Sequence, residues 1–253
     1  MIDIHSHILW GVDDGVKTFE DSARMLRISA ESGTTDIVAT PHSNSRYTFE
    51  PVLIEARIEE LRQVSGLPHI HRGCDFNLSY ENIQDGLISP EKYTLNHLNY
   101  LLVEFPDLNI SPAIDKVFVQ FLDRDIVPII THPERNGLLQ QRIPKLTAWV
   151  KEGCLLQVTA LSITGGFGKE ARDCAWDLLQ RGLVHVVASD AHDPEHRHTR
   201  LNEAREAVAK RFGEENANLL FEINPRAAIE GRDPTHIQAM AVEPKRKWFS
   251  FLR

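Results

Sequence analysis

The residues of this chain that could do chemistry are histidines and carboxylates in short, repeated groups. His5 and His7 stand two residues apart, and Asp190 and His192 repeat that spacing. Residues two apart on a strand project to the same side, as ligands of one metal ion must. Imidazole and carboxylate together suit zinc, manganese or iron. The spacing therefore predicts a site for divalent metal ions.

Further candidates come directly after other apolar runs of the chain. They are Asp13, Asp14, His42, Asp75, Glu104 and His132. Roughly nine candidate ligands exceed the needs of one ion, so we expect two or three ions that share bridging carboxylates. Taken singly, each has a structural alternative: Glu104 could pair with Arg135, and His132 could be a hydrogen-bonded turn residue. For the joint set this alternative is weak, because each buried, uncompensated charge costs several kcal/mol.

Short apolar, β-branched runs alternate with segments whose apolar residues recur every three to four positions. The predicted strands are 1–4, 36–40, 69–73, 100–104, 127–131, 154–159 and 184–189. The predicted helices are 18–33, 52–64, 111–123, 144–152, 169–181 and 199–212. This alternation predicts an α/β fold with a parallel sheet and right-handed crossovers, either closed as a barrel or open and doubly wound. We expect one domain over 1–233, followed by a flexible tail over 234–253.

The candidate ligands share one position relative to these strands. Six of the seven predicted strands run directly into a His, Asp or Glu. The carboxyl ends of parallel strands meet at one mouth of the fold. Histidines scattered at random would not respect strand direction, so the side chains are expected to converge on one pocket.

Composition limits the partners and the compartment. The chain has 36 acidic and 28 basic side chains, with a formal net charge of −8, which argues against a general nucleic-acid binder. Three cysteines are a poor disulfide framework, and neither a secretory leader nor an apolar run long enough for a membrane span is found, so a cytoplasmic protein is expected. The basic-aromatic end, 244–253, could contact an anionic membrane or a partner, or could simply be frayed.

Four motifs carry a resemblance to a known family. They are His-Ser-His at 5–7, Thr-Pro-His at 40–42, His-Pro-Glu-Arg at 132–135 and Ser-Asp-Ala-His at 189–192. In this order they resemble the polymerase-and-histidinol-phosphatase (PHP) superfamily. Together with Val-Asp-Asp-Gly at 12–15, Leu-Val-Glu-Phe at 102–105 and Asn-Pro-Arg at 224–226, they are similar to the bacterial manganese-dependent protein-tyrosine phosphatases of capsule and exopolysaccharide loci. The resemblance covers about residues 1 to 230.

The resemblance implies a distorted seven-stranded parallel (β/α)7 barrel with three metal ions at its carboxyl-terminal mouth. The ligand sets that it implies are His5, His7 and Asp190 for one ion, Glu104 and His132 for a second, and Asp14, His42 and His192 for a third. Asp75 stands where the family usually has a glutamate that bridges two ions, so its side chain is one methylene shorter. Arg135 and Arg197 match positions that grip the phosphate.

The implied activity is hydrolysis of phosphotyrosine in a protein by a metal-bridging hydroxide. Manganese is the expected ion, with iron or zinc as alternatives, and the expected partner is a bacterial tyrosine kinase that controls polysaccharide export. Two other interpretations stay open: a small-molecule phosphatase, such as one acting on histidinol phosphate, and a binding module that has lost efficient metal bridging through Asp75. Candidates for a general acid are His198 and Asp14.

The sequence excludes one rival phosphatase chemistry. Cysteine-dependent tyrosine phosphatases resemble one another in a cysteine with an arginine six residues later. Here the sixth residues after Cys74, Cys154 and Cys174 are a tyrosine, an alanine and a glutamine. A cysteine nucleophile of that type is therefore ruled out.

Overall fold

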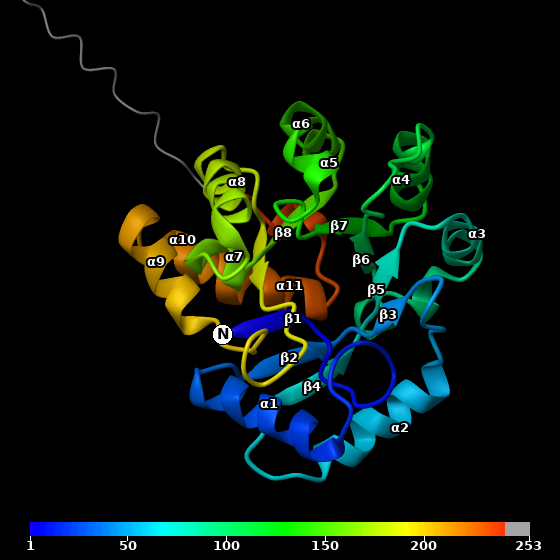
Figure 1. Cartoon of the computed structure of the whole chain (residues 1–253). Helices are drawn as coiled ribbons and strands as arrows, with labels where there is room; N and C mark the ends of the chain where they lie inside the picture. Colours follow the sequence, from blue (N-terminus) through cyan, green and yellow to red (C-terminus); the bar gives the residue numbers. More distant parts are fainter. Residues whose placement is uncertain (241–253) are drawn as a thin grey trace, which may run out of the picture.

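The seven apolar runs form seven of the nine described strands, and every strand pair is parallel. The computed structural model describes residues 1–240 (Figure 1). Its strands are β1 (Ile2–Ser6), β2 (Asp36–Ala39), β3 (His42–Ser43), β4 (His69–Arg72), β5 (Asp75–Asn77), β6 (Tyr100–Glu104), β7 (Val127–Thr131), β8 (Leu155–Thr159) and β9 (Val186–Ala188). β3 and β5 are short strands that the sequence did not predict; each begins after a break of two residues that follows a predicted strand, β2 or β4.

The described strands form two sheets, in the orders β1-β2-β4 and β3-β5-β6-β7-β8-β9. The two sheets are separated at the breaks after β2 and β4. Pro41, in the first break, has no N–H for a strand-pairing hydrogen bond, and a Cβ at Gly73, in the second, would lie 2.7 Å from Leu95. Among the described residues a single isolated bridge, Ser6 to Ala191, joins β1 to the segment that follows β9. The α/β fold with parallel strands is confirmed, whereas the closed seven-stranded barrel is not.

Alternating side chains divide the apolar core in two. In β6, Tyr100 and Leu102 belong to an inner cluster, whereas Leu101 and Val103 pack in an outer cluster beneath the helices. The inner cluster also contains Ala227, Ala228 and Ile229, so a C-terminal helix plugs the interior from one end. The polar side chains therefore gather at the opposite end of the interior, at the carboxyl ends of the strands.

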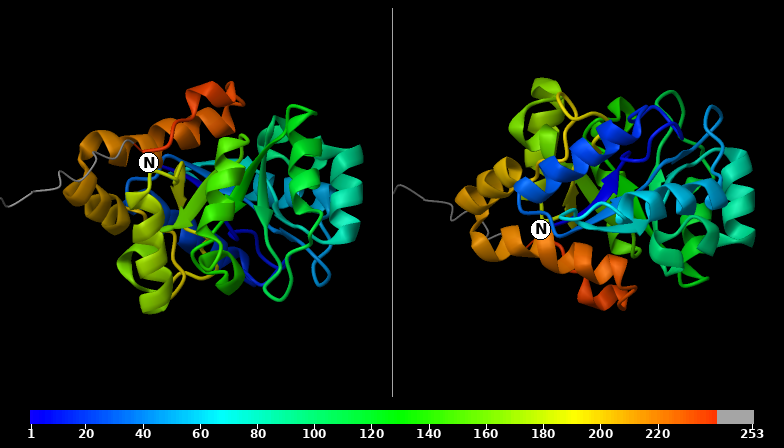
Figure 2. Two further views of the ribbon diagram at one scale, coloured as in Figure 1. Left: turned by 90° about the horizontal axis from the view of Figure 1, so that it is seen from above. Right: turned by 90° about the horizontal axis from the view of Figure 1, so that it is seen from below.

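Helices surround the strands on the outside (Figure 2). The main ones are α1 (Phe19–Glu31), α2 (Pro51–Arg62), α3 (Tyr80–Ile88), α4 (Ile114–Leu122), α6 (Ile143–Lys151), α8 (Gly168–Gln180) and α9 (Asn202–Phe212). Shorter ones are α5 (Gly137–Gln140), α7 (Ala160–Thr164), α10 (Glu214–Asn218), a π-helix (Leu219–Ile223) and α11 (Asn224–Ile229), which plugs the interior. All six predicted helices are present, and Thr18 caps α1 through the N–H of Asp21 as its sequence predicts. No described helix has the length and apolar character of a membrane span.

The predicted tail begins too early. Residues 234–240 continue to pack on the domain, because the side chains of Ile237 and Met240 are buried and Asn224 donates a hydrogen bond to the carbonyl of Gln238. The remaining part of the predicted tail, including the basic-aromatic end, lies outside the described residues.

His185, just before β9, is expected to make the stability of the fold depend on pH. The N–H of Leu156 donates to its Nδ1, and burial lowers its pKa to about 4. In the unfolded state His185 becomes protonated near pH 6.5, whereas in the folded state it becomes protonated only near pH 4. The free energy of unfolding therefore falls as the pH drops through this window. At pH 5 the loss amounts to about 2 kcal/mol relative to pH 7.

Urea unfolding of the metal-free protein at pH 7 and pH 5 measures this effect. His185→Gln keeps a hydrogen-bond acceptor but cannot titrate, so its free energy of unfolding should change less between the two pH values, by about 2 kcal/mol. Equal pH dependence in the native protein and the variant would contradict the assignment.

Candidate metal centre

A bulge in β1 aims His5 into the interior. Asp3 pairs with Ile37 and Ser6 with Ala39, so β1 has one residue more than β2 between these pairs. The extra residue lets Ile4 join the inner apolar cluster while the next side chain, His5, also turns inward. A bulge is a common device for redirecting one side chain beside a site.

Hydrogen bonds fix the orientation of three imidazoles. His5 Nδ1 donates to the amide oxygen of Gln157 at 2.9 Å, and His7 Nδ1 donates to Asp13 at 2.7 Å. His192 Nδ1 donates to the main-chain oxygen of Asp190 at 3.1 Å. In each ring this leaves Nε2 directed toward the interior, which is the arrangement of a metal-ligating histidine and its supporting partner.

Asp13 is held by the loop that carries it. Its Oδ1 accepts the N–H of Gly15 at 2.9 Å, and its Oδ2 accepts the N–H of His42 at 3.1 Å as well as His7. A Cβ on Gly15 would lie 2.3 Å from the carbonyl oxygen of His7, so only glycine fits this close approach. Asp13 therefore positions His7 and the start of β3 together.

All nine predicted metal ligands meet at the carboxyl ends of the strands. Four groups have donor atoms within 4.8 Å of one another: His7, Asp14, His42 and His192; His5, His7 and Asp75; His5, His132 and Asp190; and His42, Asp75 and Glu104. Four of the residues belong to two groups each. The arrangement is thus one continuous cluster, as sharing of ligands between ions requires.

The grouping differs in part from the ligand sets that the resemblance implies. Asp14, His42 and His192 do stand together, with His7 as a fourth member. Glu104 groups with His42 and Asp75, while its Oε1 lies 3.9 Å from Nε2 of His132. The alternative pairing of Glu104 with Arg135 is wrong, because the Arg135 guanidinium donates to Asp190.

Asp75 provides the test of whether a cation fits here. Its carboxylate is fully buried, and neither oxygen accepts a hydrogen bond from any described residue. Its Oδ2 lies 3.5 Å from Nε2 of His5 and 3.2 Å from Nδ1 of His42, which is itself buried without a hydrogen bond. Such orphaned groups cost about 1–3 kcal/mol each unless something else satisfies them. A divalent cation among these donors would do so.

The protonation of the cluster also indicates an excess of negative charge. Burial raises the pKa of Glu104 to about 7, and the charge of Asp75 adds to the rise. Burial should lower the pKa of His42, but contacts with Asp14 and Asp75 outweigh it and raise the pKa to about 11. Without metal the carboxylates thus draw protons onto nearby groups. Metal ions would take the place of those protons.

Backbone strain is stored at two members of the cluster. His132 has φ 33° and Asp190 has φ 48°, both in the left-handed region that residues other than glycine rarely adopt. His132 directly follows β7, and Asp190 lies two residues after the end of β9. Strain of this kind persists only where the surroundings enforce it, and it is concentrated at functional sites.

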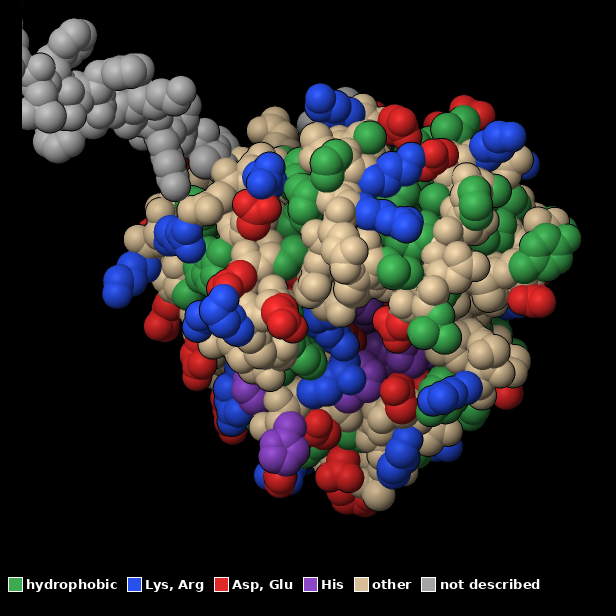
Figure 3. Space-filling view, turned by 45° about the horizontal axis from the view of Figure 1, so that its top comes forward, with side chains coloured by type: hydrophobic (Ala, Val, Ile, Leu, Met, Phe, Trp, Pro, Cys, Tyr) green, Lys and Arg blue, Asp and Glu red, His purple; other side chains and the backbone are tan. Residues whose placement is uncertain are grey.

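Two arginines flank the cluster. Arg135 and Arg197 both donate to Oδ2 of Asp190, and Arg197 Nη2 also donates to the Asp190 main-chain oxygen at 3.1 Å. With ligands of the cluster they line a pocket of about 120 Å³. Figure 3 shows histidines at the bottom of a hollow, with basic side chains at its edge. A small polar pocket with cations at its edge suits a phosphate group.

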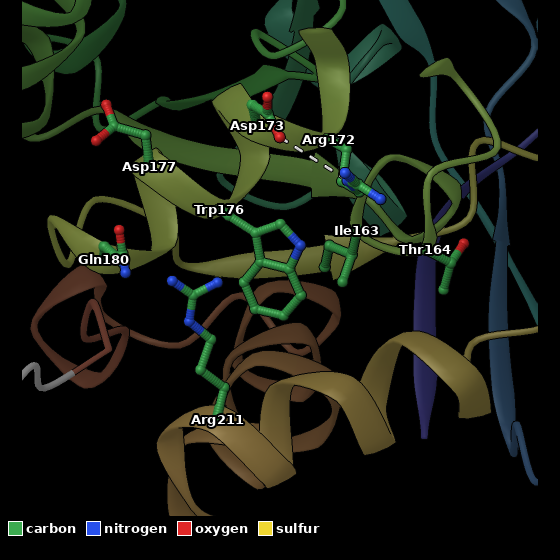
Figure 4. Close-up of a pocket in the computed structure, with 8 residues that line it drawn as sticks. All are labelled: Ile163, Thr164, Arg172, Asp173, Trp176, Asp177, Gln180 and Arg211. Atoms are coloured by element: carbon green, nitrogen blue, oxygen red, sulfur yellow. Dashed lines mark ion pairs between the residues drawn. The ribbon is translucent and has the colours of Figure 1, made fainter. Parts of the chain in front are cut away.

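A larger hollow of about 560 Å³ lies between α7, α8 and α9 (Figure 4). In the close-up, Arg211 reaches toward the ring of Trp176, and the two are in cation–π contact at 4.6 Å. Its carboxylates are paired, Asp173 with Lys169 and Asp177 with Arg181. The hollow contains no histidine, so it lacks the donors that distinguish the cluster.

Four residues have supporting roles that the sequence does not predict. Gln157 orients His5, Asn77 donates to Glu104 at 3.2 Å, and Phe167 lies against both arginines. Asp13 is visible in the sequence as a carboxylate after the first strand, but nothing there marks it as the partner of His7. Gln157 does carry a signal, since it is a lone amide within the apolar strand β8.

A family model and individual relatives of known name point to the same family. The family model described as capsular polysaccharide synthesis, CpsB/CapC, matches residues 1–230. The tyrosine-protein phosphatase YwqE of Bacillus subtilis is 33% identical over 227 residues, which are 88% of this chain and 89% of that protein. The tyrosine-protein phosphatase CpsB of Streptococcus pneumoniae is 32% identical over 239 residues, which are 90% and 98% of the two chains.

Solved structures agree. A structure from the work on YwqE and CpsB, described there as unique metal-dependent tyrosine phosphatases, superimposes with a TM-score of 0.86 at 30% identity, over 95% of this chain and 100% of that one. Dihydropyrimidinase from Brevibacillus agri matches with a TM-score of 0.55 at 13% identity over 95% and 72% of the chains, which shows a shared fold alone. This chain belongs to the CpsB/CapC family of capsular polysaccharide synthesis proteins.

Proposed function

We propose that the protein is a metal-dependent protein-tyrosine phosphatase. The observation that carries the proposal is the cluster of five imidazoles and four carboxylates, in which neither oxygen of Asp75 accepts a hydrogen bond, beside two arginines at a small polar pocket. Its relatives YwqE and CpsB are named tyrosine-protein phosphatases. Hydrolysis of a phosphate ester uses both features, because clustered divalent cations activate water and guanidinium groups stabilise the charge of the phosphoryl oxygens.

Two or three divalent ions, with manganese proposed and iron or zinc as alternatives, would be held by the nine clustered residues. When bound, such ions supply positive charge for the phosphoryl oxygens and lower the pKa of water so that hydroxide is available near neutral pH. Gln157 and Asp13 accept the Nδ1–H groups of His5 and His7, so that Nε2 of each ring faces the cluster and would bind an ion there. Asp75, central to two of the four groups, would be shared between ions.

Arg135 and Arg197 are proposed to bind the phosphate. Within the described residues the Arg135 guanidinium donates a single hydrogen bond, to Asp190, and Nε of Arg197 is buried without a partner. Their remaining N–H groups are therefore available to phosphoryl oxygens. A planar guanidinium can hold a carboxylate and a phosphate at the same time, which a lysine ammonium does poorly.

The proposed substrate is phosphotyrosine in a protein, namely a bacterial tyrosine kinase of polysaccharide export. A tyrosine phenolate has a pKa near 10, so it leaves more readily than an alkoxide and needs less help from a general acid. The proposed compartment is the cytoplasm, where the three free cysteines stay reduced.

Metal removal tests the proposal. Dialysis against EDTA should lower hydrolysis of para-nitrophenyl phosphate by at least about a hundred-fold, because both the nucleophile and the charge at the phosphoryl oxygens depend on the ions. Manganese should restore the rate, and a magnesium-only sample serves as a comparison. Activity that survives EDTA would contradict the metal mechanism.

A second measurement separates the proposed substrate from the small-molecule alternative. Turnover of a phosphotyrosine peptide is compared with turnover of histidinol phosphate by the manganese-loaded protein. We expect kcat/KM for the peptide to be higher by at least about ten-fold, given the better leaving group. A preference for the alkyl phosphate would favour the small-molecule alternative.

A further inference from the structure

One aromatic ring contacts both arginines of the pocket. The guanidinium carbon of Arg135 lies 4.1 Å from the ring centre of Phe167, and that of Arg197 lies 5.6 Å from the same ring. Both distances are within the range of cation–π attraction. Arg135 comes after β7 and Arg197 after β9, so this ring connects two loops that no strand pairing joins directly.

The chain around Phe167 is shaped to place the ring there. Phe167 lies between α7 and α8, and Gly165 and Gly168 beside it have φ of +97° and +87°. Residues other than glycine rarely adopt this backbone conformation, so the two glycines allow the chain to turn sharply on either side of Phe167. The Phe167 side chain is half-buried, as expected for a ring packed on one side against other groups.

Stacking governs which way the N–H groups of an arginine point. A guanidinium that lies over an aromatic face keeps its N–H donors in its own plane and free for hydrogen bonds. Without such support, the Asp190 carboxylate, which both arginines already contact, would compete with a phosphate for these donors. The buried, unpartnered Nε of Arg197 shows that donors remain unused in this arrangement.

We propose that Phe167 is a positioning residue that holds Arg135 and Arg197 ready for phosphate. The proposal rests on the proposed function, because it takes the pocket to be the phosphate site. Phe167 makes no contact with the reacting atoms; it acts through the two guanidinium groups. Its loss should weaken phosphate binding more than it slows the chemical step.

The test uses metal-loaded protein with inorganic phosphate as the probe, measured by isothermal titration calorimetry. Phe167→Ala should raise the Kd for phosphate about ten-fold, since two cation–π contacts are lost. The KM for a phosphotyrosine peptide should rise by a similar factor, while kcat changes by less than about three-fold. Phe167→Tyr and Phe167→Trp keep a π face and should stay within about two-fold of the native Kd.

Two comparisons exclude a merely structural role. Phe167→Leu keeps apolar bulk but has no π face, so it should bind phosphate as weakly as Phe167→Ala. Tyr80→Ala removes an exposed ring outside the pocket and should leave the Kd unchanged. A native Kd in Phe167→Leu or Phe167→Ala overturns the inference, as does failure of the native protein to bind phosphate. Phosphate binding without turnover of phosphotyrosine would instead overturn the proposed function alone.

Discussion

Replacing Asp75 with asparagine is expected to lower kcat/KM for para-nitrophenyl phosphate about a thousand-fold, which corresponds to about 4 kcal/mol of lost transition-state stabilisation. The substitution keeps the shape of the side chain but removes its charge. It also brings N–H donors to a place where Oδ2 of the carboxylate lies near both His5 and His42 and neither oxygen accepts a hydrogen bond. An amide there would repel the cations that the carboxylate attracts. Metal content of the purified variant, measured by mass spectrometry, should fall with the activity.

Asp36 gives a matched control for this experiment. It is also a buried strand carboxylate, but it begins β2 at the opposite end, where it pairs with His71 and Arg226. Asp36→Asn should therefore retain its metal and stay within about three-fold of native kcat/KM. Equal losses in the two variants would indicate general damage to the fold and contradict the role given to Asp75.

Asp75→Glu addresses the interpretation of the chain as an inactive binding module. A glutamate has the side-chain length that the resemblance implies at this position, but it must fit a fully buried site. If the native protein is an enzyme, the longer side chain should not increase its rate by more than about ten-fold. Activity that appears only in Asp75→Glu would support the binding module instead.

The sequence predicted the strands well, because buried parallel strands read as short apolar runs. All seven runs became strands, and the six predicted helices lie within a few residues of their expected bounds. The closed barrel could not be derived in this way. Whether the strands close depends on the breaks near Pro41 and Gly73 and on how the edges of the two sheets meet, which are matters of register that a pattern of apolar residues does not specify.

Convergence of the candidate ligands could be predicted because topology alone enforces it. Parallel strands bring the residues at their carboxyl ends to one mouth, and most candidates were chosen for their position at or just after the end of a strand. The grouping within the mouth depends on side-chain direction, which the bulge before His5 and the left-handed backbone at His132 and Asp190 decide. These local departures from regular geometry leave no periodic signal in the sequence.

Supporting residues were the hardest to predict. Phe167 is one of 11 phenylalanines, and nothing in its neighbourhood except the glycines distinguishes it from a core residue. Its role depends on two arginines that are distant from it and from each other in the chain. Asp13 is visible in the sequence as a carboxylate near the site. Only its 2.7 Å contact with Nδ1 of His7 shows that it orients a ligand instead of being one.

Arg135→Lys is expected to lower kcat/KM about a hundred-fold, which is typical of removing one preorganised donor from a developing oxyanion. Lysine keeps the charge, so long-range attraction of the phosphate should survive. It loses the planar fork with which Arg135 can contact Asp190 and a phosphoryl oxygen together, while its ring contact with Phe167 also changes. Steady-state kinetics of the manganese-loaded variant, with para-nitrophenyl phosphate and a phosphotyrosine peptide, measure the loss.

The pattern of the loss across substrates decides whether the contact is to phosphate. Both substrates share only the aryl phosphate, so the two losses should agree within about three-fold. Arg181→Lys, in an exposed pair with Asp177 on α8, makes the same chemical change away from the pocket and should leave both rates unchanged. A loss confined to the peptide would place Arg135 against the polypeptide instead of the phosphate, because only the peptide offers the enzyme a chain on either side of the tyrosine.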